Sequence, residues 1–152
     1  MTPTSSWYQS PTFWAGIAAW VIAQILKLVV HIRRTGKFDP AFLLRLGGMP
    51  SSHSATVVAV AVSIGLLHGF GSSLFVLALT FAVIVMIDAQ SVRRAAGQQA
   101  RLLNQIVDEL FREHHLSQQK LAELIGHTPM EVLLGLLLGV FTTLIVHTAF
   151  GV

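Results

Sequence analysis

The sequence contains 152 residues, of which 53% are hydrophobic and 11% are charged, and its net charge is +3. Because soluble domains carry about 25% charged residues, this composition indicates a single membrane domain, residues 1–152, rather than a soluble one. The absence of cysteine excludes disulfides and thiolate metal sites. In a membrane protein, a surplus of Lys and Arg reports loop orientation, so we do not expect nucleic acid as a partner.

Four apolar segments alternate with polar ones along the chain, at 12–32, 55–70, 74–87 and 129–150. About 20 residues cross a hydrocarbon core of roughly 30 Å, so the first and last segments are long enough to span it. The two middle segments are somewhat short, and we expect their ends to extend into the polar flanks. The sequence therefore predicts an all-α integral membrane protein with about four transmembrane helices.

The first predicted helix carries four polar residues on one face. Gln24, Lys27, His31 and Arg34 recur at i, i+3, i+7 and i+10. A lone Lys near a helix end usually extends to the headgroups. A stripe of four polar groups instead indicates a face turned toward the bundle interior or a polar cleft, where a charge is a functional candidate.

A polar, glycine-rich turn at 47–54 precedes the second apolar segment. Pro50 cannot continue a preceding helix, and Ser51 or Ser52 can cap a new one. The first N–H groups of that helix and its positive dipole end would then lie beside His53, which favours an anion such as phosphate. The alternative is an ordinary serine-capped helix start.

Residues 88–126 form the only long hydrophilic segment and open with Asp88, Arg93 and Arg94. Apolar residues from Leu102 to Phe111 recur at helical spacing, which predicts a strongly amphipathic helix within a cytoplasmic insertion at about 89–126. Such a helix could lie on the membrane face or against a partner subunit. A plain soluble helical hairpin is an equal alternative.

The last apolar segment begins with two motifs that bear on function and packing. Thr128 and Glu131 match a capping box, so Glu131 could be purely structural. Gly135 and Gly139 form a G-x-x-x-G pair, which would let another helix approach closely.

Nine of the 10 Lys and Arg residues fall in two segments, 33–45 and 93–120, and the tenth is Lys27 at the end of the first helix. The positive-inside rule therefore places both segments in the cytoplasm and both termini outside. We expect an inner, plasma or thylakoid-type membrane.

This topology gathers separate polar motifs at one depth. Lys27, His53, Asp88 and the pair His127 and Glu131 would all lie at the cytoplasmic membrane surface. Two histidines, a carboxylate and several cations suit phosphoryl transfer to an imidazole. One neutral His attacks, a carboxylate orients it, and a second, protonated His donates to the leaving oxygen. Lys and Arg neutralise the phosphoryl oxygens, and neither a metal nor another cofactor is needed.

The motifs also resemble those of a known superfamily. Pro50-Ser51-Ser52-His53 looks like the Pro-Ser-Gly-His motif of type-2 phosphatidic acid phosphatases and vanadium haloperoxidases. Likewise, His127-x-x-x-Glu131 resembles their His-x-x-x-Asp, and Lys27-x6-Arg34 their Lys-x6-Arg-Pro. The combination of Gly-Gly-Met-Pro-Ser-Ser-His-Ser-Ala, Asp-Ala-x-x-Val-Arg-Arg and Gly-His-Thr-Pro-x-Glu-Val is most similar to the small divergent branch of that superfamily.

The resemblance implies a membrane lipid-phosphate phosphatase that passes through a phosphohistidine. His127 would be the nucleophile, Glu131 its orienting partner and His53 the general acid. The phosphate-binding residues would be Lys27, Arg34, Ser51, Ser52, Arg93 and Arg94, and Asp88 would support the arginines. Phosphatidylglycerophosphate, phosphatidate and prenyl phosphates are the expected substrates, and a cytoplasmic site favours the first.

The sequence departs from the superfamily pattern at three places. Ser52 replaces a glycine, Thr35 follows Arg34 in place of a proline, and Lys120 and Leu121 stand where Ser-Arg is expected. We expect Arg93 or Arg94 to supply the missing charge. Four spans instead of the usual six leave the site with fewer walls, so a homodimer could complete it. The alternative function is a non-catalytic protein that binds or transports a lipid phosphate or prenyl phosphate.

Overall fold

The computed structural model describes residues 6–38, 48–110 and 127–152. Its elements are η1 (Trp7–Gln9), α1 (Pro11–Thr35), α2 (Ser52–His68), α3 (Ser73–Gln90), α4 (Val92–Leu110) and α5 (Pro129–Phe150). In this part of the chain every regular element is a helix, and three helical runs are long and apolar enough to cross a membrane. These runs are α1, Ser73–Val107 and α5, and α2 is a shorter apolar helix. The predicted all-α membrane fold is confirmed.

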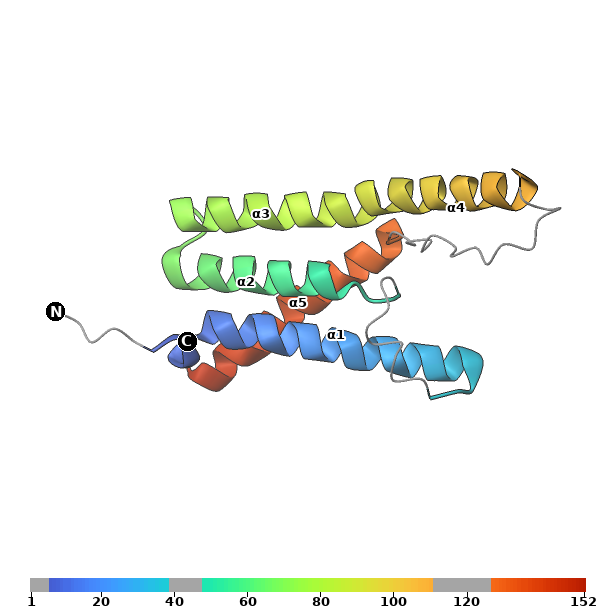
Figure 1. Ribbon diagram of the computed structural model, residues 1–152. Helices are drawn as coiled ribbons and strands as arrows, with labels where there is room; N and C mark the ends of the chain where they lie inside the picture. The colour runs from blue at the N-terminus through green and yellow to red at the C-terminus, as the bar shows by residue number, and fades with distance from the viewer. Residues whose placement is uncertain (1–5, 39–47, 111–126) are drawn as a thin grey trace.

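The central element of the bundle is α2, which packs against α1, α3 and α5. Figure 1 shows α1, α2 and α3 as neighbouring rods, with α5 crossing obliquely behind α1 and α2. Helices α2 and α5 run in one direction, whereas α1 and α3 run in the other. Residues far apart in the sequence therefore meet at each end of the bundle.

Small residues allow these helices to pack closely. Ala15, Ala19 and Ala23 of α1 are fully buried against Ala55 and Ala59 of α2. Lipid tails are as apolar as leucine, so close packing of small side chains is what holds such helices together in a membrane.

The G-x-x-x-G pair lies where α5 crosses α2. A Cβ atom on Gly135 would collide with the Ser51 carbonyl, and one on Gly139 with the Ala55 carbonyl. The predicted close approach is confirmed, and the partner helix is α2. Because Ser51 is also part of the polar turn, this contact fixes the start of α5 against that turn.

Buried polar groups mark the two ends of the bundle. At one end, called here the Thr12 end, Thr12 Oγ1 lies 2.9 Å from Ser63 Oγ, and Ser63 Oγ lies 2.7 Å from Nε2 of His147. At the other, called here the Lys27 end, Lys27 of α1 donates a hydrogen bond to Ser52 of α2. Side-chain contacts thus join α1, α2 and α5 at the Thr12 end. At the Lys27 end, a side-chain hydrogen bond joins α1 and α2.

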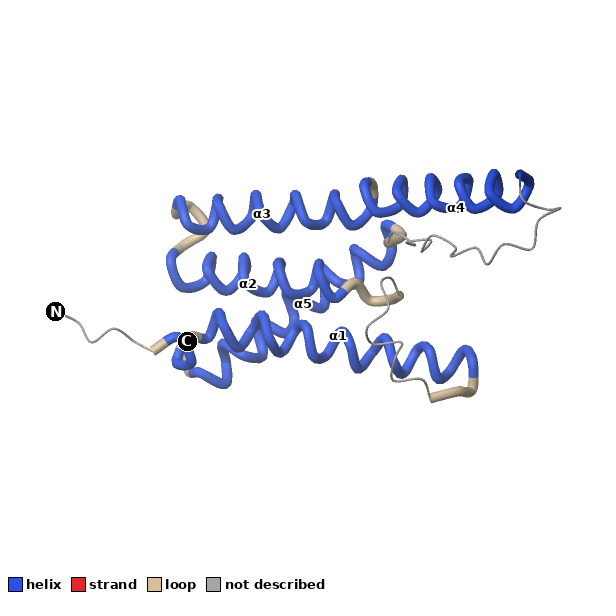
Figure 2. The backbone as a smooth tube through the Cα atoms, viewed as in Figure 1, coloured by secondary structure: helices blue, strands red, loops and turns tan. Residues whose placement is uncertain are grey.

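The amphipathic helix predicted after Asp88 is present as α4. Figure 2 shows α4 continuing along the line of α3, and the two form a helical run of 35 residues from Ser73 to Val107. At 1.5 Å per residue this run is roughly 50 Å long, well beyond the ~30 Å hydrocarbon core. Neither Pro nor Gly stands between Asp88 and Ala96, so nothing in the sequence there forces a turn. The remainder of the predicted insertion, 111–126, lies outside the described residues.

Candidate functional site

The turn before α2 has the local structure that its sequence predicts. Ser51 is the N-cap of α2, and its side-chain oxygen accepts hydrogen bonds from the backbone N–H and the hydroxyl of Ser54. Gly48 has a φ of +90°, a conformation that favours glycine. His53 therefore lies in the first turn of a helix, next to the N–H groups and positive dipole end that favour an anion.

Lys27 reaches this turn from α1. Its Nζ donates a hydrogen bond to Ser52 Oγ over 3.1 Å, and only 5% of the residue is exposed. The negative charge of Glu131 on α5 also acts on this ammonium group. Lys27 of α1 and Ser52 of α2 are thus in hydrogen-bonding contact, and the carboxylate of Glu131 on α5 is near enough to attract the ammonium group.

The start of α5 holds His127 beside Glu131. Nδ1 of His127 lies 3.0 Å from Oε2 of Glu131. Because a carboxylate only accepts hydrogen bonds, Nδ1 carries the hydrogen, and the lone pair of the neutral ring resides on Nε2. This is the tautomer in which Nε2 can act as a nucleophile.

Oε2 of Glu131 has a second role in the same turn. It also accepts a hydrogen bond from the backbone N–H of Thr128, while Thr128 Oγ1 accepts one from the N–H of Glu131. The capping box suggested by the sequence is confirmed. The structural and the functional interpretation of Glu131 are therefore not exclusive, because one oxygen serves both contacts.

Two backbone hydrogen bonds join this helix start to its neighbours. The N–H of His127 donates to the carbonyl of Ala89 at the end of α3, and the N–H of Ser51 donates to the carbonyl of Glu131, each over 2.9 Å. Neither contact could be predicted from sequence, since a backbone hydrogen bond leaves no mark on residue type. Together they bring α2, α3 and α5 to one place.

The two histidines lie close enough to act on one group. The ring centroids of His53 and His127 are 6.4 Å apart, with the ring planes inclined at 60°. His127 is 3% exposed, whereas His53 is exposed. A phosphoryl group between the rings would have an accessible imidazole on one side and a water-shielded one on the other.

The remaining predicted site residues are less closely placed. Arg34 is exposed and lies seven residues after Lys27, about 10 Å further along α1. Asp88 is half-buried and directly precedes Ala89. Arg93 and Arg94 belong to α4, but their side chains lie outside what the structure describes. Within residues 6–38, 48–110 and 127–152, no three His, Asp or Glu side chains cluster as metal ligands would.

The assembled residues can bind an anion and can carry out acid–base or nucleophilic chemistry. Lys27, Ser52 and the start of α2 supply positive charge and donors, and His127 with Glu131 supplies an oriented imidazole. The fold and this cluster define an all-α membrane protein with a polar, charge-bearing site at one end of its bundle.

Comparison with known proteins identifies the family. The model of the divergent PAP2 family matches residues 8–142, so the chain belongs to that family. It is also similar to the uncharacterised membrane protein YuiD of Bacillus subtilis (strain 168), with 40% identity over 142 residues. That match covers 86% of this chain and 90% of YuiD. No solved structure shows significant similarity to the chain.

Proposed function

We propose that this protein is a membrane lipid-phosphate phosphatase that acts through a phosphohistidine intermediate on His127. The observation that carries the proposal is the 3.0 Å contact between Nδ1 of His127 and Oε2 of Glu131, with the ring of His53 6.4 Å from that of His127. Membership of the divergent PAP2 family supports a phosphatase-like chemistry.

In the first step, Nε2 of His127 attacks the phosphorus of a phosphomonoester, and the bond from phosphorus to the ester oxygen breaks. The protonated ring of His53 gives its proton to that oxygen, which leaves as an alcohol. Glu131 stabilises the positive charge that develops on the His127 ring. Lys27 and Ser52 bind the non-bridging oxygens, where the charge of the transition state resides.

In the second step, water attacks the phosphohistidine. The now neutral ring of His53 takes a proton from this water, the N–P bond breaks, and inorganic phosphate leaves. His127 returns to its neutral form with Nδ1–H still directed at Glu131. His53 is exposed and so gives this water a route to the phosphorus.

The substrate class that fits is a phosphorylated membrane lipid, with phosphatidylglycerophosphate as the first candidate. The proposal places the Lys27 end at the cytoplasmic surface and the termini outside, which the clustering of basic residues supports. That a second copy of the chain completes the site stays a prediction.

The test is phosphate release from a panel of phosphatidylglycerophosphate, phosphatidate and prenyl phosphates, using purified protein without added metal. We expect turnover by the wild type and loss of turnover in both His127→Ala and His53→Ala. His68→Ala provides the matched control, because His68 is an exposed histidine at the opposite end of α2. Full activity in either site variant would contradict the mechanism.

One observation favours a second function, the binding or transport of a lipid phosphate without chemistry. His127 is almost fully buried, which suits a residue that shapes a binding site better than one that must reach a substrate. This alternative predicts that lipid phosphates bind and protect the protein against unfolding, while none is hydrolysed.

A further inference from the structure

An apolar groove of about 440 Å³ lies between α1 and α5, beside the turn that begins α2. Leu26 and Val30 of α1 and Leu134 and Phe141 of α5 line the groove, together with Pro50 of the turn. Its volume falls in the range of ligand pockets, roughly 300–1,000 Å³.

The groove begins where the polar site ends. Pro50 directly precedes Ser51, and Leu26 directly precedes Lys27. On α5 the groove continues the helix face of Glu131, since Leu134, Leu138 and Phe141 follow it at i+3, i+7 and i+10. A molecule with a phosphate at Lys27 could therefore extend along this face without crossing another helix.

The groove is open along its side and extends from the polar site to about the depth of one leaflet. On α5 its lining runs from Leu134 to Phe141, seven residues or about 10 Å along the helix axis. Measured from Glu131, Phe141 lies ten residues or about 15 Å away, which is half of the ~30 Å hydrocarbon core. The side chains of Leu26, Leu137 and Phe141 are 40%, 42% and 62% exposed, so the groove is open along its side.

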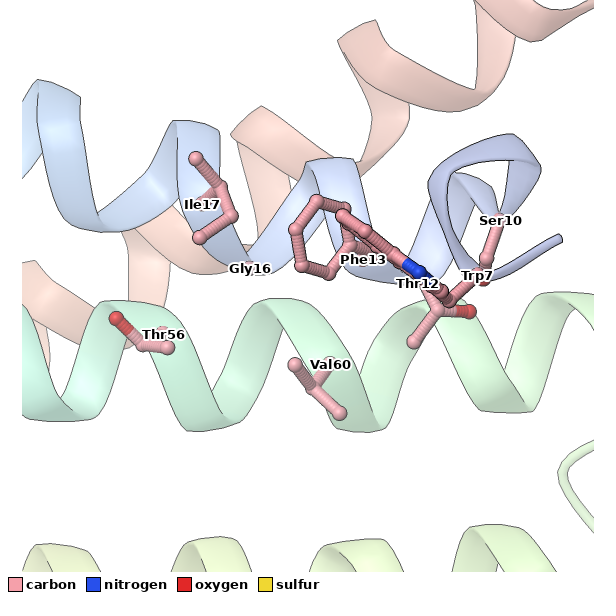
Figure 3. A pocket seen from close by; sticks show the side chains of 8 residues that line it. All are labelled: Trp7, Ser10, Thr12, Phe13, Gly16, Ile17, Thr56 and Val60. Atoms are coloured by element: carbon pink, nitrogen blue, oxygen red, sulfur yellow. The ribbon is translucent and has the colours of Figure 1, made fainter.

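A second pocket gives a useful contrast. It has a volume of about 510 Å³ and lies between α1 and α2 at the other end of the bundle, lined by Trp7, Phe13, Thr12 and Val60 (Figure 3). Its lining extends to Thr56, whose hydroxyl donates to the Ser52 carbonyl, but it includes neither Lys27 nor any residue of the turn at 48–54. Of these two hollows, only the groove between α1 and α5 is lined by a residue of that turn, Pro50.

We propose that the groove between α1 and α5 receives one hydrocarbon chain of the lipid whose phosphate is bound at the Lys27 end. This inference rests on the proposed function, because it assumes that the polar site binds a lipid phosphate. A hydrocarbon chain gains little free energy when it leaves the bilayer lipid and contacts leucine side chains instead. The groove therefore orients the lipid, so that its phosphate stays between His53 and His127, and it selects substrates with a long chain.

The first experiment compares two substrates in purified protein, a long-chain phosphatidate in mixed micelles and a short-chain, monomeric phosphatidate. We expect Leu137→Trp, which fills the groove with an indole, to lower the ratio of long-chain to short-chain kcat/KM about tenfold. Leu144→Trp is the matched control, since Leu144 lies outside the groove on the same helix and is 46% exposed. An equal ratio in both variants would overturn the inference.

The second experiment measures binding and needs no substitution. Wild-type protein in phosphatidylcholine vesicles is photolabelled on ice, immediately after mixing and before hydrolysis, with a phosphatidate that carries a diazirine on its chain. We expect labels on Leu26, Val30 and 134–141 to exceed those on α3, where Leu77 and Phe81 are 68% and 61% exposed. Unlabelled phosphatidate should displace the groove labels, because phosphatidylcholine lacks the phosphomonoester and already fills the vesicle. Equal labelling of the groove and α3 would contradict the inference.

The two experiments separate the failure of the groove from the failure of the chemistry. If no substrate is hydrolysed but phosphatidate displaces the groove labels, the catalytic proposal fails and the chain-binding groove stands. If both substrates are hydrolysed but the Trp variants and the labels show no preference, the groove alone fails. A disulfide between two copies of Leu137→Cys would show that a second chain covers the groove, and would also overturn the inference.

Discussion

The carboxylate of Glu131 accepts a hydrogen bond from Nδ1 of His127 and another from the backbone of Thr128, both at 3.0 Å and both on the same oxygen. The helix start that positions the histidine and the group that orients its ring are therefore one structural unit. One substitution can remove the charge of Glu131 and keep the cap, and another can weaken the cap and keep the charge. The catalytic and the capping role of Glu131 can therefore be tested separately.

Replacing Glu131 with Gln tests its role toward His127. Gln also serves in capping boxes, so we expect little loss of stability. The negative charge that stabilises a cationic His127 ring is lost, and kcat should fall by about 100-fold or more. Phosphate-release kinetics and the thermal midpoint Tm in detergent measure the two effects.

Thr128→Ala is the matched control for the cap. It should lower stability by about 1 kcal/mol, because a side-chain cap is removed. It leaves the contact between His127 and Glu131 in place, so kcat should fall much less than in Glu131→Gln. A similar loss of activity in the two variants would show that Glu131 acts only through the helix start.

Lys27→Met tests whether the buried ammonium binds the substrate phosphate. A charged hydrogen bond contributes about 1.5–3 kcal/mol, so kcat/KM should fall roughly 10- to 100-fold. Tm should change little, because the cost of burying the ammonium group is removed while Glu131 loses a nearby positive charge. Lys27→Arg is the comparison, since it keeps the charge, and it should retain more activity than the Met variant.

Gly139→Ala should destabilise the fold by about 1–3 kcal/mol, because its methyl group would push the Ala55 carbonyl of α2 away from α5. Gly71→Ala is the control, since a Cβ atom there meets nothing within 4 Å. Thermal unfolding in detergent should show a lower Tm for Gly139→Ala and an unchanged Tm for Gly71→Ala. An unchanged Tm for Gly139→Ala would mean that α2 and α5 can move apart at this position at little cost.

Ser63→Ala tests the polar chain at the Thr12 end. Nε2 of the buried His147 would lose its hydrogen-bond partner, which should cost about 1–3 kcal/mol of stability. Ser63 lies 11 residues after Ser52, or about 16 Å along α2, so kcat/KM should change little. Thr80→Ala, at an exposed position of α3, is the control for loss of a hydroxyl. A large loss of activity at normal Tm would instead assign the Thr12 end a part in the reaction.

The absence of cysteine allows the proposed orientation to be tested directly with single-cysteine variants. Gly71 lies between α2 and α3, and Lys37 follows α1, so these two exposed residues lie at opposite ends of the bundle. In sealed, right-side-out vesicles, a membrane-impermeant maleimide should label Gly71→Cys and leave Lys37→Cys unlabelled until the vesicles are opened. The reverse pattern would place the Lys27 end outside.

Local features of this protein follow from its sequence alone. The apolar segments, the serine cap at Ser51, the capping box of Thr128 and Glu131, and the close approach at Gly135 and Gly139 all depend on residues within a few positions of one another. Helix periodicity and helix-end hydrogen bonding act over that range, so these features could be predicted and are present.

The way in which these local features combine into a site depends on the tertiary structure. The amphipathic pattern after Asp88 identified a helix, but only the fold shows α4 continuing the line of α3. The stripe on α1 identified Lys27, but the contact with Ser52 depends on how α1 and α2 are rotated about their axes. His147 and Ser63 lie 84 residues apart in the sequence, and only the fold makes these two buried side chains hydrogen-bond partners. Such contacts join residues distant in sequence, and side-chain packing between helices, which no local pattern encodes, sets their geometry.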